Sequence, residues 1–214
     1  MNLSLLRTGV ALLVFGSAGL IAQAVPAQEK PKEPDIAAAY RSSFEHERAQ
    51  DYQNSIRALA PVYEAYPAGY TVNLRMGWLF YLNGNYANSV AHYEVATTSA
   101  PLALEPKLGH LLPLLAQGRW TEAEALAYQV VSVDHYNYYG NLRLAVALRM
   151  QGKAEAAYQI ALKMVGAYPT DLPYLVELAN IQDARGDTDE ARRLFGEILI
   201  LDPENQVARR YLGR

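Results

Sequence analysis

Hydrophobic and small residues recur at helical spacing in segments of about a dozen residues, and short polar segments separate them. Four polar segments share a form, a glycine before a polar helix start: NGNYANSV, QGRWTEAE, QGKAEAAY and RGDTDEAR. Their glycines recur at one constant interval, at Gly84, Gly118, Gly152 and Gly186. A glycine here supplies the left-handed residue that ends one helix before the next begins. The pattern predicts a pair of helices that is repeated at this interval.

Prolines follow the same period. Pro101, Pro169 and Pro203 each lie half an interval after one of these glycines, and Pro67 lies half an interval after Gln50. A proline at this place closes the second helix of a pair, because it cannot extend a helix. Placing each glycine at position 15 of its unit divides the chain into five units, 36–69, 70–103, 104–137, 138–171 and 172–205.

The residues within the units resemble the tetratricopeptide repeat family, whose 34-residue helix-turn-helix carries the pattern W-x2-L-G-x2-Y, A-x3-F, A, P. The second unit matches it at Met76-Gly77, Phe80, Tyr86, Ser89, Tyr93, Ala96 and Pro101. The resemblance implies an all-α fold, an α-solenoid of five tandem helix-turn-helix repeats. Residues 206–214 are expected to form a short C-terminal capping helix.

Small and large residues alternate in a way that suits this packing. Small residues such as Gly77 in a first helix and Ala157 in a second allow two helix axes to approach to the short end of the ~8–10 Å range. Large residues such as Tyr93, Leu148 and Phe195 are expected to fill the space between neighbouring pairs. One pair cannot bury both of its apolar sides, so a core requires several pairs in series.

The third unit departs from the pattern. Pro106 fits a first helical turn, where its missing N–H costs nothing. Pro113 falls inside the expected first helix, where a proline costs ~3 kcal/mol and kinks the axis. His135 replaces the closing proline. We expect a bend or a shortened first helix in this unit, and the alternative is a kink accommodated by its neighbours.

The N-terminal residues have the pattern of an exported protein. Residues 1–24 read as a signal peptide, with a positive start at Arg7, an apolar run over 10–22 and the small residues of Ala22-Gln23-Ala24 before the cut. A cut after Ala27 and an uncleaved membrane anchor remain alternatives. Residues 25–35 contain three prolines among charges and are expected to form a Pro-rich linker. The expected location is periplasmic or extracellular.

Composition and motifs argue against catalysis. The chain contains no cysteine, which excludes a disulfide framework, a cysteine-ligated zinc site and a thiol nucleophile. Its 19 Lys and Arg against 22 Asp and Glu form no basic block, so a nucleic-acid interface is not expected. The four histidines match no HExxH pattern, and the sequence lacks GxSxG, P-loop and GxGxxG motifs. We therefore expect no catalytic residues, no metal site and no cofactor.

The first helices of such a stack line its concave wall, and positions 2, 5, 9 and 12 of each unit share one helix stripe. Leu108, Leu112 and Val146 lie on this stripe and are expected to be buried by packing. Some family members bind the terminal carboxylate of a peptide with Lys and Asn at positions 5 and 9 of the first unit. In this chain Tyr40 and Phe44 occupy these positions, so this carboxylate clamp is absent. The candidate partner-binding groove consists of Tyr40, Phe44, Leu74, Trp78, Tyr81, Tyr139, Arg149 and Asn180.

An apolar, aromatic groove indicates a binding function. The first hypothesis is a non-catalytic protein-interaction scaffold outside the cytoplasm, which binds a partner segment in the groove or self-associates through it. The alternative is a glycan-binding or polysaccharide-export accessory protein, because the 16 tyrosines could stack on sugars. Contact with a membrane is expected only through an uncleaved signal anchor.

Overall fold

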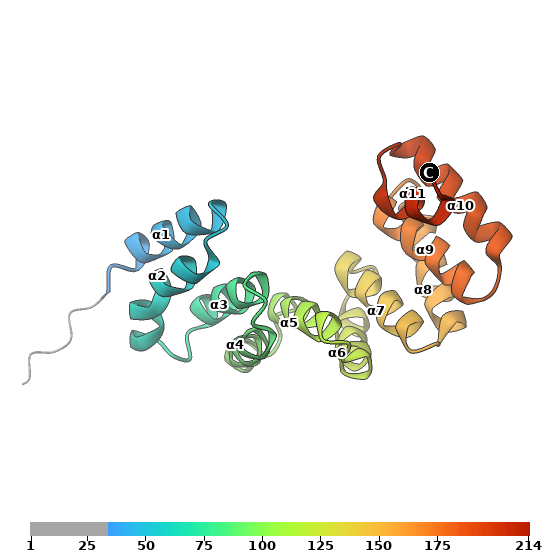
Figure 1. The fold of residues 1–214 in the computed structure, drawn as a ribbon. Helices are drawn as coiled ribbons and strands as arrows, with labels where there is room; N and C mark the ends of the chain where they lie inside the picture. Colours follow the sequence, from blue (N-terminus) through green and yellow to red (C-terminus); the bar gives the residue numbers. More distant parts are fainter. Residues whose placement is uncertain (1–33) are drawn as a thin grey trace, which may run out of the picture. The chain divides into compact units, whose positions relative to one another are not determined.

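The computed structural model describes residues 34–214 of the chain. The predicted signal peptide, 1–24, and most of the predicted linker, 25–35, lie outside the described residues. The described part is all-α (Figure 1). Its helices are α1 (Ile36–Arg48), α2 (Tyr52–Ala65), α3 (Tyr70–Leu82), α4 (Tyr86–Ser99), α5 (Glu105–Ala116), α6 (Trp120–Val133), α7 (Tyr138–Met150), α8 (Ala154–Ala167), α9 (Leu172–Ala184), α10 (Thr188–Leu201) and α11 (Gln206–Leu212).

Consecutive helices pack against one another as antiparallel pairs, from α1 with α2 to α9 with α10 (Figure 1). The first helices of neighbouring pairs also touch, because α3 contacts α5, α5 contacts α7 and α7 contacts α9. These contacts place the first helices in one layer, which carries the candidate groove. The predicted fold class, an α-solenoid of helix-turn-helix repeats, is confirmed.

The turns inside the pairs are built as the glycine spacing predicts. Gly84, Gly118, Gly152 and Gly186 have φ angles of +74°, +69°, +75° and +84°, in the left-handed region. The first pair has Gln50 at the same place, with a φ of 59°. A side chain in this conformation costs about 1–2 kcal/mol, so glycine is the residue that suits the turn.

Small residues lie where the helices of a pair approach each other. Gly77 is buried, and Ala145, Ala157 and Ala191 are fully buried. The hydroxyl of Ser89 on α4 donates to the carbonyl of Gly77 on α3 at 2.7 Å, which satisfies a buried polar group at this contact.

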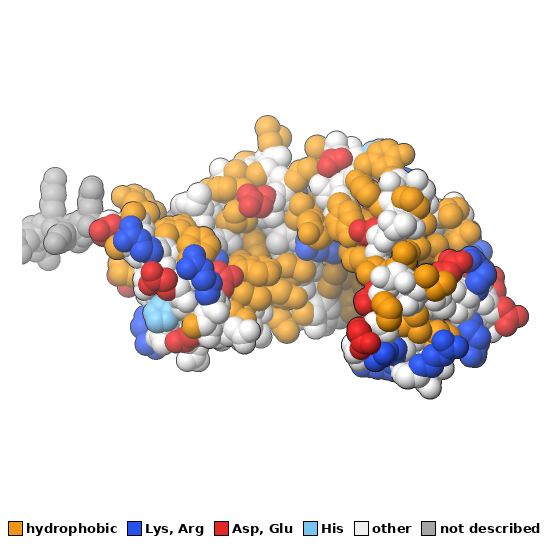
Figure 2. Space-filling model, turned by 90° about the horizontal axis from the view of Figure 1, so that it is seen from above, with side chains coloured by type: hydrophobic (Ala, Val, Ile, Leu, Met, Phe, Trp, Pro, Cys, Tyr) orange, Lys and Arg blue, Asp and Glu red, His pale blue; other side chains and the backbone are white. Residues whose placement is uncertain are grey.

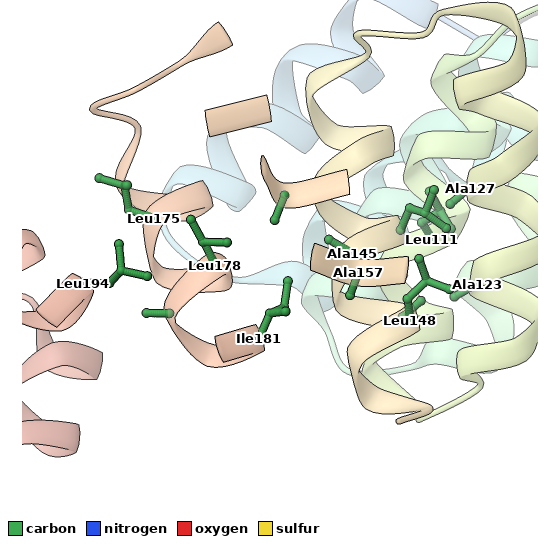
Figure 3. Close-up of a cluster of buried hydrophobic side chains, with 14 of the residues drawn as sticks. Leu111, Ala123, Ala127, Ala145, Leu148, Ala157, Leu175, Leu178, Ile181 and Leu194 are labelled. Atoms are coloured by element: carbon green, nitrogen blue, oxygen red, sulfur yellow. The ribbon is translucent and has the colours of Figure 1, made fainter. Parts of the chain in front are cut away.

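The large residues expected between pairs are buried: Tyr93, Leu148 and Phe195 expose 2% or less of their surface. A continuous cluster of buried hydrophobic side chains runs through the pairs from α4 to α11. Figure 3 shows part of it, in which Leu111 of α5 lies near Ala127 of α6 and Leu148 of α7 lies near Ala123. A smaller cluster joins α2 and α3 and includes Leu59 and Leu79.

Helix α5 has 12 residues, against 13 in α3, α7 and α9, so the expected shortening amounts to one residue. Pro106 lies in its first turn, as predicted. The helix continues through Pro113, which is buried. Because Pro113 has no N–H, the carbonyl of Gly109 lacks its usual helical donor.

The C-terminal helix α11 packs on α10. Ala208 is fully buried, and the ring centroid of Tyr211 lies 4.3 Å from that of Phe195. The short helix therefore covers part of the last apolar face, as expected for a cap.

Candidate functional site

A cavity on the layer of first helices has a volume of about 380 Å³. It is bounded mainly by apolar and aromatic side chains of α3, α5 and α7, and Tyr93 of α4 also lines it. The lining residues are Leu74, Trp78, Tyr93, Glu105, Leu108, Gly109, Leu112 and Tyr139.

A second cavity of about 300 Å³ adjoins the first, because Leu74, Trp78 and Glu105 line both. It extends toward α1 and adds Tyr40, Thr71 and Arg75. We call the two cavities together the groove. Figure 2 shows a face on which hydrophobic side chains gather in a hollow, with charged side chains toward its sides.

The floor of the groove is the ring of Tyr93, which reaches it from α4. A β-carbon built on Gly77 would lie 3.0 Å from this ring, and one built on Gly109 would lie 2.2 Å from it. The ring therefore fits only because α3 and α5 both carry a glycine where they face it. Burial raises the pKa of the Tyr93 hydroxyl, which keeps the floor uncharged.

The indole of Trp78 forms the wall shared by the two cavities. Its Nε1–H donates to Glu47 Oε1 at 2.6 Å, and the other oxygen of that carboxylate lies 2.5 Å from Arg75 Nη1. The Arg75 guanidinium in turn lies 3.9 Å above the centroid of the Phe44 ring. The polar edge of the indole is thus already bonded within the protein, so its apolar face is what remains for a ligand.

Arg143 of α7 does not line either cavity, but it contacts two residues that line the larger one. Its Nη1 donates to the carbonyl oxygen of Leu108 at 2.5 Å, and its guanidinium lies 5.0 Å from the centroid of the Tyr139 ring. Burial lowers the pKa of Arg143, opposed by the nearby Tyr139, Tyr93 and Tyr81. The larger cavity therefore has a mainly apolar lining, with a positive group behind Leu108 and Tyr139 on its α7 side.

The structure brings four of the eight predicted groove residues into the groove: Tyr40, Leu74, Trp78 and Tyr139. Two more adjoin it, since Phe44 stacks against Arg75 and the Tyr81 ring lies 5.8 Å from that of Trp78.

The remaining two predicted residues, Arg149 and Asn180, do not line either cavity. The guanidinium of Arg149 is directed at Glu177 of α9, with which it forms an ion pair at 2.7 Å. This ion pair belongs to the contact between α7 and α9, so the groove ends before it.

The three stripe residues expected to be buried, Leu108, Leu112 and Val146, are only partly buried. Leu108 and Leu112 line the larger cavity. The packing of neighbouring units therefore leaves part of the stripe open, and these two leucines add to the apolar lining of the groove.

Five residues of the groove were not predicted from the sequence: Thr71, Arg75, Tyr93, Glu105 and Gly109. Tyr93 belongs to a second helix, and the stripe considered only first helices. The signal that was available is Gly109, because a glycine inside a predicted helix costs about 1 kcal/mol relative to alanine and therefore marks a close contact.

Residues 34–214 hold no cluster of three or more His, Asp or Glu side chains that could bind a metal ion. Within the same residues, no helix combines the length and the hydropathy needed to span a bilayer. His110 is partly buried, and its Nε2 has no hydrogen-bond partner among the described residues.

Solved structures with a similar fold include two that are described as tetratricopeptide repeat proteins. MamA from Desulfovibrio magneticus RS-1 matches with a TM-score of 0.71 and 18% identity, over 82% of this chain and 99% of that one. YrrB is described as a tetratricopeptide repeat protein with an unusual peptide-binding site. It matches with a TM-score of 0.67 and 10% identity, over 86% of this chain and 94% of that one. A tetratricopeptide repeat protein from Parabacteroides merdae ATCC 43184 matches with a TM-score of 0.72 and 13% identity, over 81% of this chain and 69% of that one. At these identities the likeness concerns the fold alone.

A search of curated proteins found no match to this sequence. The model of the tetratricopeptide repeat family matches residues 45–103 and 112–171, which make up more than half of the chain. With the helix pairs and their glycine turns, this match identifies the chain as a member of the tetratricopeptide repeat family.

Proposed function

We propose that this protein is a non-catalytic scaffold that binds a hydrophobic segment of a partner protein in the groove between α1, α3, α5 and α7. The observation that carries the proposal is the pair of adjoining apolar cavities that share the face of Trp78. Aromatic side chains at the centre of a protein interface supply much of its binding energy, at about 2 kcal/mol or more each. The similar fold of YrrB, whose description includes a peptide-binding site, supports the same class of ligand.

The groove is suited to an apolar segment because the polar edge of its central tryptophan is already bonded within the protein. Glu47 holds both the Trp78 N–H and Arg75. A ligand with apolar side chains packed on the face of the indole would thus displace water without breaking these bonds.

The test is chemical crosslinking in intact cells with the double variant Trp78→Ala/Tyr81→Ala. We expect this variant to lose at least 90% of the partner crosslinked to the wild-type protein, an estimate that follows from removing about 2 kcal/mol per anchor. The matched control is Trp120→Ala, which removes the other tryptophan, at the start of α6 and outside the groove. Far-UV circular dichroism verifies that all variants are folded. If the double variant crosslinks the partner as well as the wild-type protein does, the groove is not the binding site.

A companion measurement separates a protein ligand from a glycan. Tryptophan fluorescence of the purified protein is followed while cell-surface polysaccharide is added, and we expect no change. A saturable change in fluorescence that is altered in the Trp78→Phe variant would show that the groove binds a glycan and not a protein.

We propose further that the protein works outside the cytoplasm. The support is the pattern of residues 1–24, with its positive start, apolar run and Ala22-Gln23-Ala24. Mass spectrometry of the protein purified from cell fractions tests this, and an exported protein that begins at Val25 is the expected result. A full-length protein confined to the cytoplasmic fraction would overturn the proposal.

A further inference from the structure

The contacts between neighbouring units contain a recurring charge pair. Glu47, at position 12 of the first unit, pairs with Arg75, at position 6 of the second. Arg149 and Glu177 occupy the same two positions in the fourth and fifth units, with the charges exchanged. The two pairs have the same separation along the chain, and side chains at these positions therefore meet across the interface between units.

Arg143 occupies position 6 of the fourth unit, but position 12 of the third unit is Leu115. The carboxylate that pairs with Arg75 thus has no equivalent at this interface. No carboxylate of residues 34–214 forms an ion pair with Arg143, and its one protein hydrogen bond goes to the Leu108 carbonyl. A partly buried cation without a counter-charge is costly to keep, because it has given up hydration without gaining a charged partner.

Two donor atoms of Arg143, Nε and Nη2, form no hydrogen bond within residues 34–214, and neither is completely buried. The guanidinium is fixed by the Leu108 carbonyl on one side and by the Tyr139 ring on the other, and both residues line the larger cavity. A group bound in this cavity would therefore meet a positioned guanidinium with two free N–H directions.

We infer that Arg143 binds the side-chain carboxylate of an Asp or Glu residue in the hydrophobic segment that occupies the groove. The inference rests on the proposed function and specifies its ligand as an acidic–hydrophobic peptide segment. The bound carboxylate supplies, from the partner, the charge that Glu47 supplies to Arg75 within the protein. Guanidinium–carboxylate contacts are among the strongest polar contacts that proteins make.

The other charges around the groove fix the place of this acid. Arg75 and Arg149 are already paired with Glu47 and Glu177, so they do not compete for it. Glu105 lines both cavities and accepts a hydrogen bond from the Tyr70 hydroxyl at 3.1 Å. Its negative charge disfavours a second carboxylate toward α3, so the acid of the ligand belongs at the α7 end.

The experiment is selection from a random peptide library in which each peptide is fused at both ends, so that no free terminal carboxylate is present. The protein from residue 25 onward is the target, beside Arg143→Leu and Trp78→Ala/Tyr81→Ala. We expect the wild-type protein to enrich apolar peptides with an Asp or Glu at one fixed position. The Arg143→Leu variant should enrich apolar peptides without that acid, and the double variant should enrich none.

The selected peptide is then compared with its Glu→Gln or Asp→Asn form. We expect the change to weaken binding to the wild-type protein about tenfold or more, which is the usual effect of losing a charge-assisted hydrogen bond, and to affect binding to Arg143→Leu less than about twofold. Leu115→Glu places a carboxylate at the position equivalent to Glu47, and it should also abolish the preference for acid, whereas Leu115→Gln should not.

The outcomes separate the two proposals. Enriched peptides without a fixed acid, or an acid preference that survives Arg143→Leu, would overturn this inference and leave the groove intact as a binding site. Enrichment only from a library with free C-termini would show that Arg143 binds a terminal carboxylate and would also overturn it. Failure of the wild-type protein to enrich any peptide would count against the proposed function itself.

Discussion

The guanidinium of Arg149 donates to both carboxylate oxygens of Glu177, from Nε at 2.7 Å and from Nη2 at 3.1 Å. The side chain of Glu177 is only 6% exposed and that of Arg149 is 21% exposed. Burial raises the pKa of Glu177, and Arg149 acts against that rise. The pair therefore joins α7 to α9 at a site where neither charge is well hydrated.

Replacing Arg149 alone is expected to destabilise the protein strongly. Arg149→Met leaves the Glu177 carboxylate buried without a partner, and we expect a loss of about 3 kcal/mol in the free energy of unfolding. The double variant Arg149→Met/Glu177→Leu removes both charges and should lie within about 1 kcal/mol of the wild type. Urea denaturation measures both. A double variant as unstable as the single one would show that the pair is not acting through burial of an unpaired charge.

Gly109→Ala is expected to destabilise the protein although alanine favours helices. Its β-carbon would lie 2.2 Å from Cε1 and 2.4 Å from Cζ of Tyr93, so the ring or helix α5 has to move. Such overpacking costs about 1–3 kcal/mol. The matched control is Gly196→Ala in α10, where an added β-carbon meets nothing within 4 Å.

Because alanine is the better helix former, the control variant should be more stable by about 0.5–1 kcal/mol. Thermal unfolding of the two variants checks the contrast. Equal effects of the two substitutions would mean that Tyr93 does not depend on the glycine beneath it.

Stability is expected to fall as the solution is acidified below neutral pH, in part because of His92. Burial lowers the pKa of His92, whose ring stacks on Phe80 at 5.1 Å and whose Nδ1 lies 2.8 Å from Asn73 Oδ1. A lowered pKa means that the folded state binds the proton less well than the unfolded state does. The contribution of His92 is thus fully present above about pH 6.5, its unfolded value, and is lost as pH falls through the folded value.

Urea denaturation between pH 7.5 and pH 5 measures this dependence. His92→Gln should reduce the slope of unfolding free energy against pH, and His110→Gln should do so as well, because burial also lowers the pKa of His110. A slope unchanged by His92→Gln would rule out this titration as a cause.

Much of the fold could be predicted from the sequence because residues within each repeat mark the ends of its helices. Gly118 and Gly152 end first helices by a local conformation, and this depends on no distant residue. The groove was predictable only in part. Trp78 and Tyr139 lie on the expected stripe, and they reach the groove because their helices touch their neighbours directly.

The groove was predicted incorrectly at residues whose side-chain direction depends on a neighbouring unit. Arg149 lies on the stripe, but the charge of Glu177 draws its guanidinium into the interface. Tyr93 enters the groove through the space left by two glycines on different helices. Comparing position 12 of each unit with position 6 of the next would have revealed the first case, because Glu47 and Arg75 repeat it.

The most direct test of the account is photocrosslinking in living cells from defined positions. A photoreactive phenylalanine analogue replaces Tyr139, which is 55% exposed at the groove, or Ile200, which is 80% exposed on α10. If the partner binds in the groove, a discrete partner adduct forms from position 139 and disappears when Trp78→Ala is added, and no such adduct forms from position 200. An adduct from position 200 alone, or one from position 139 that persists in the Trp78→Ala background, would contradict binding in the groove.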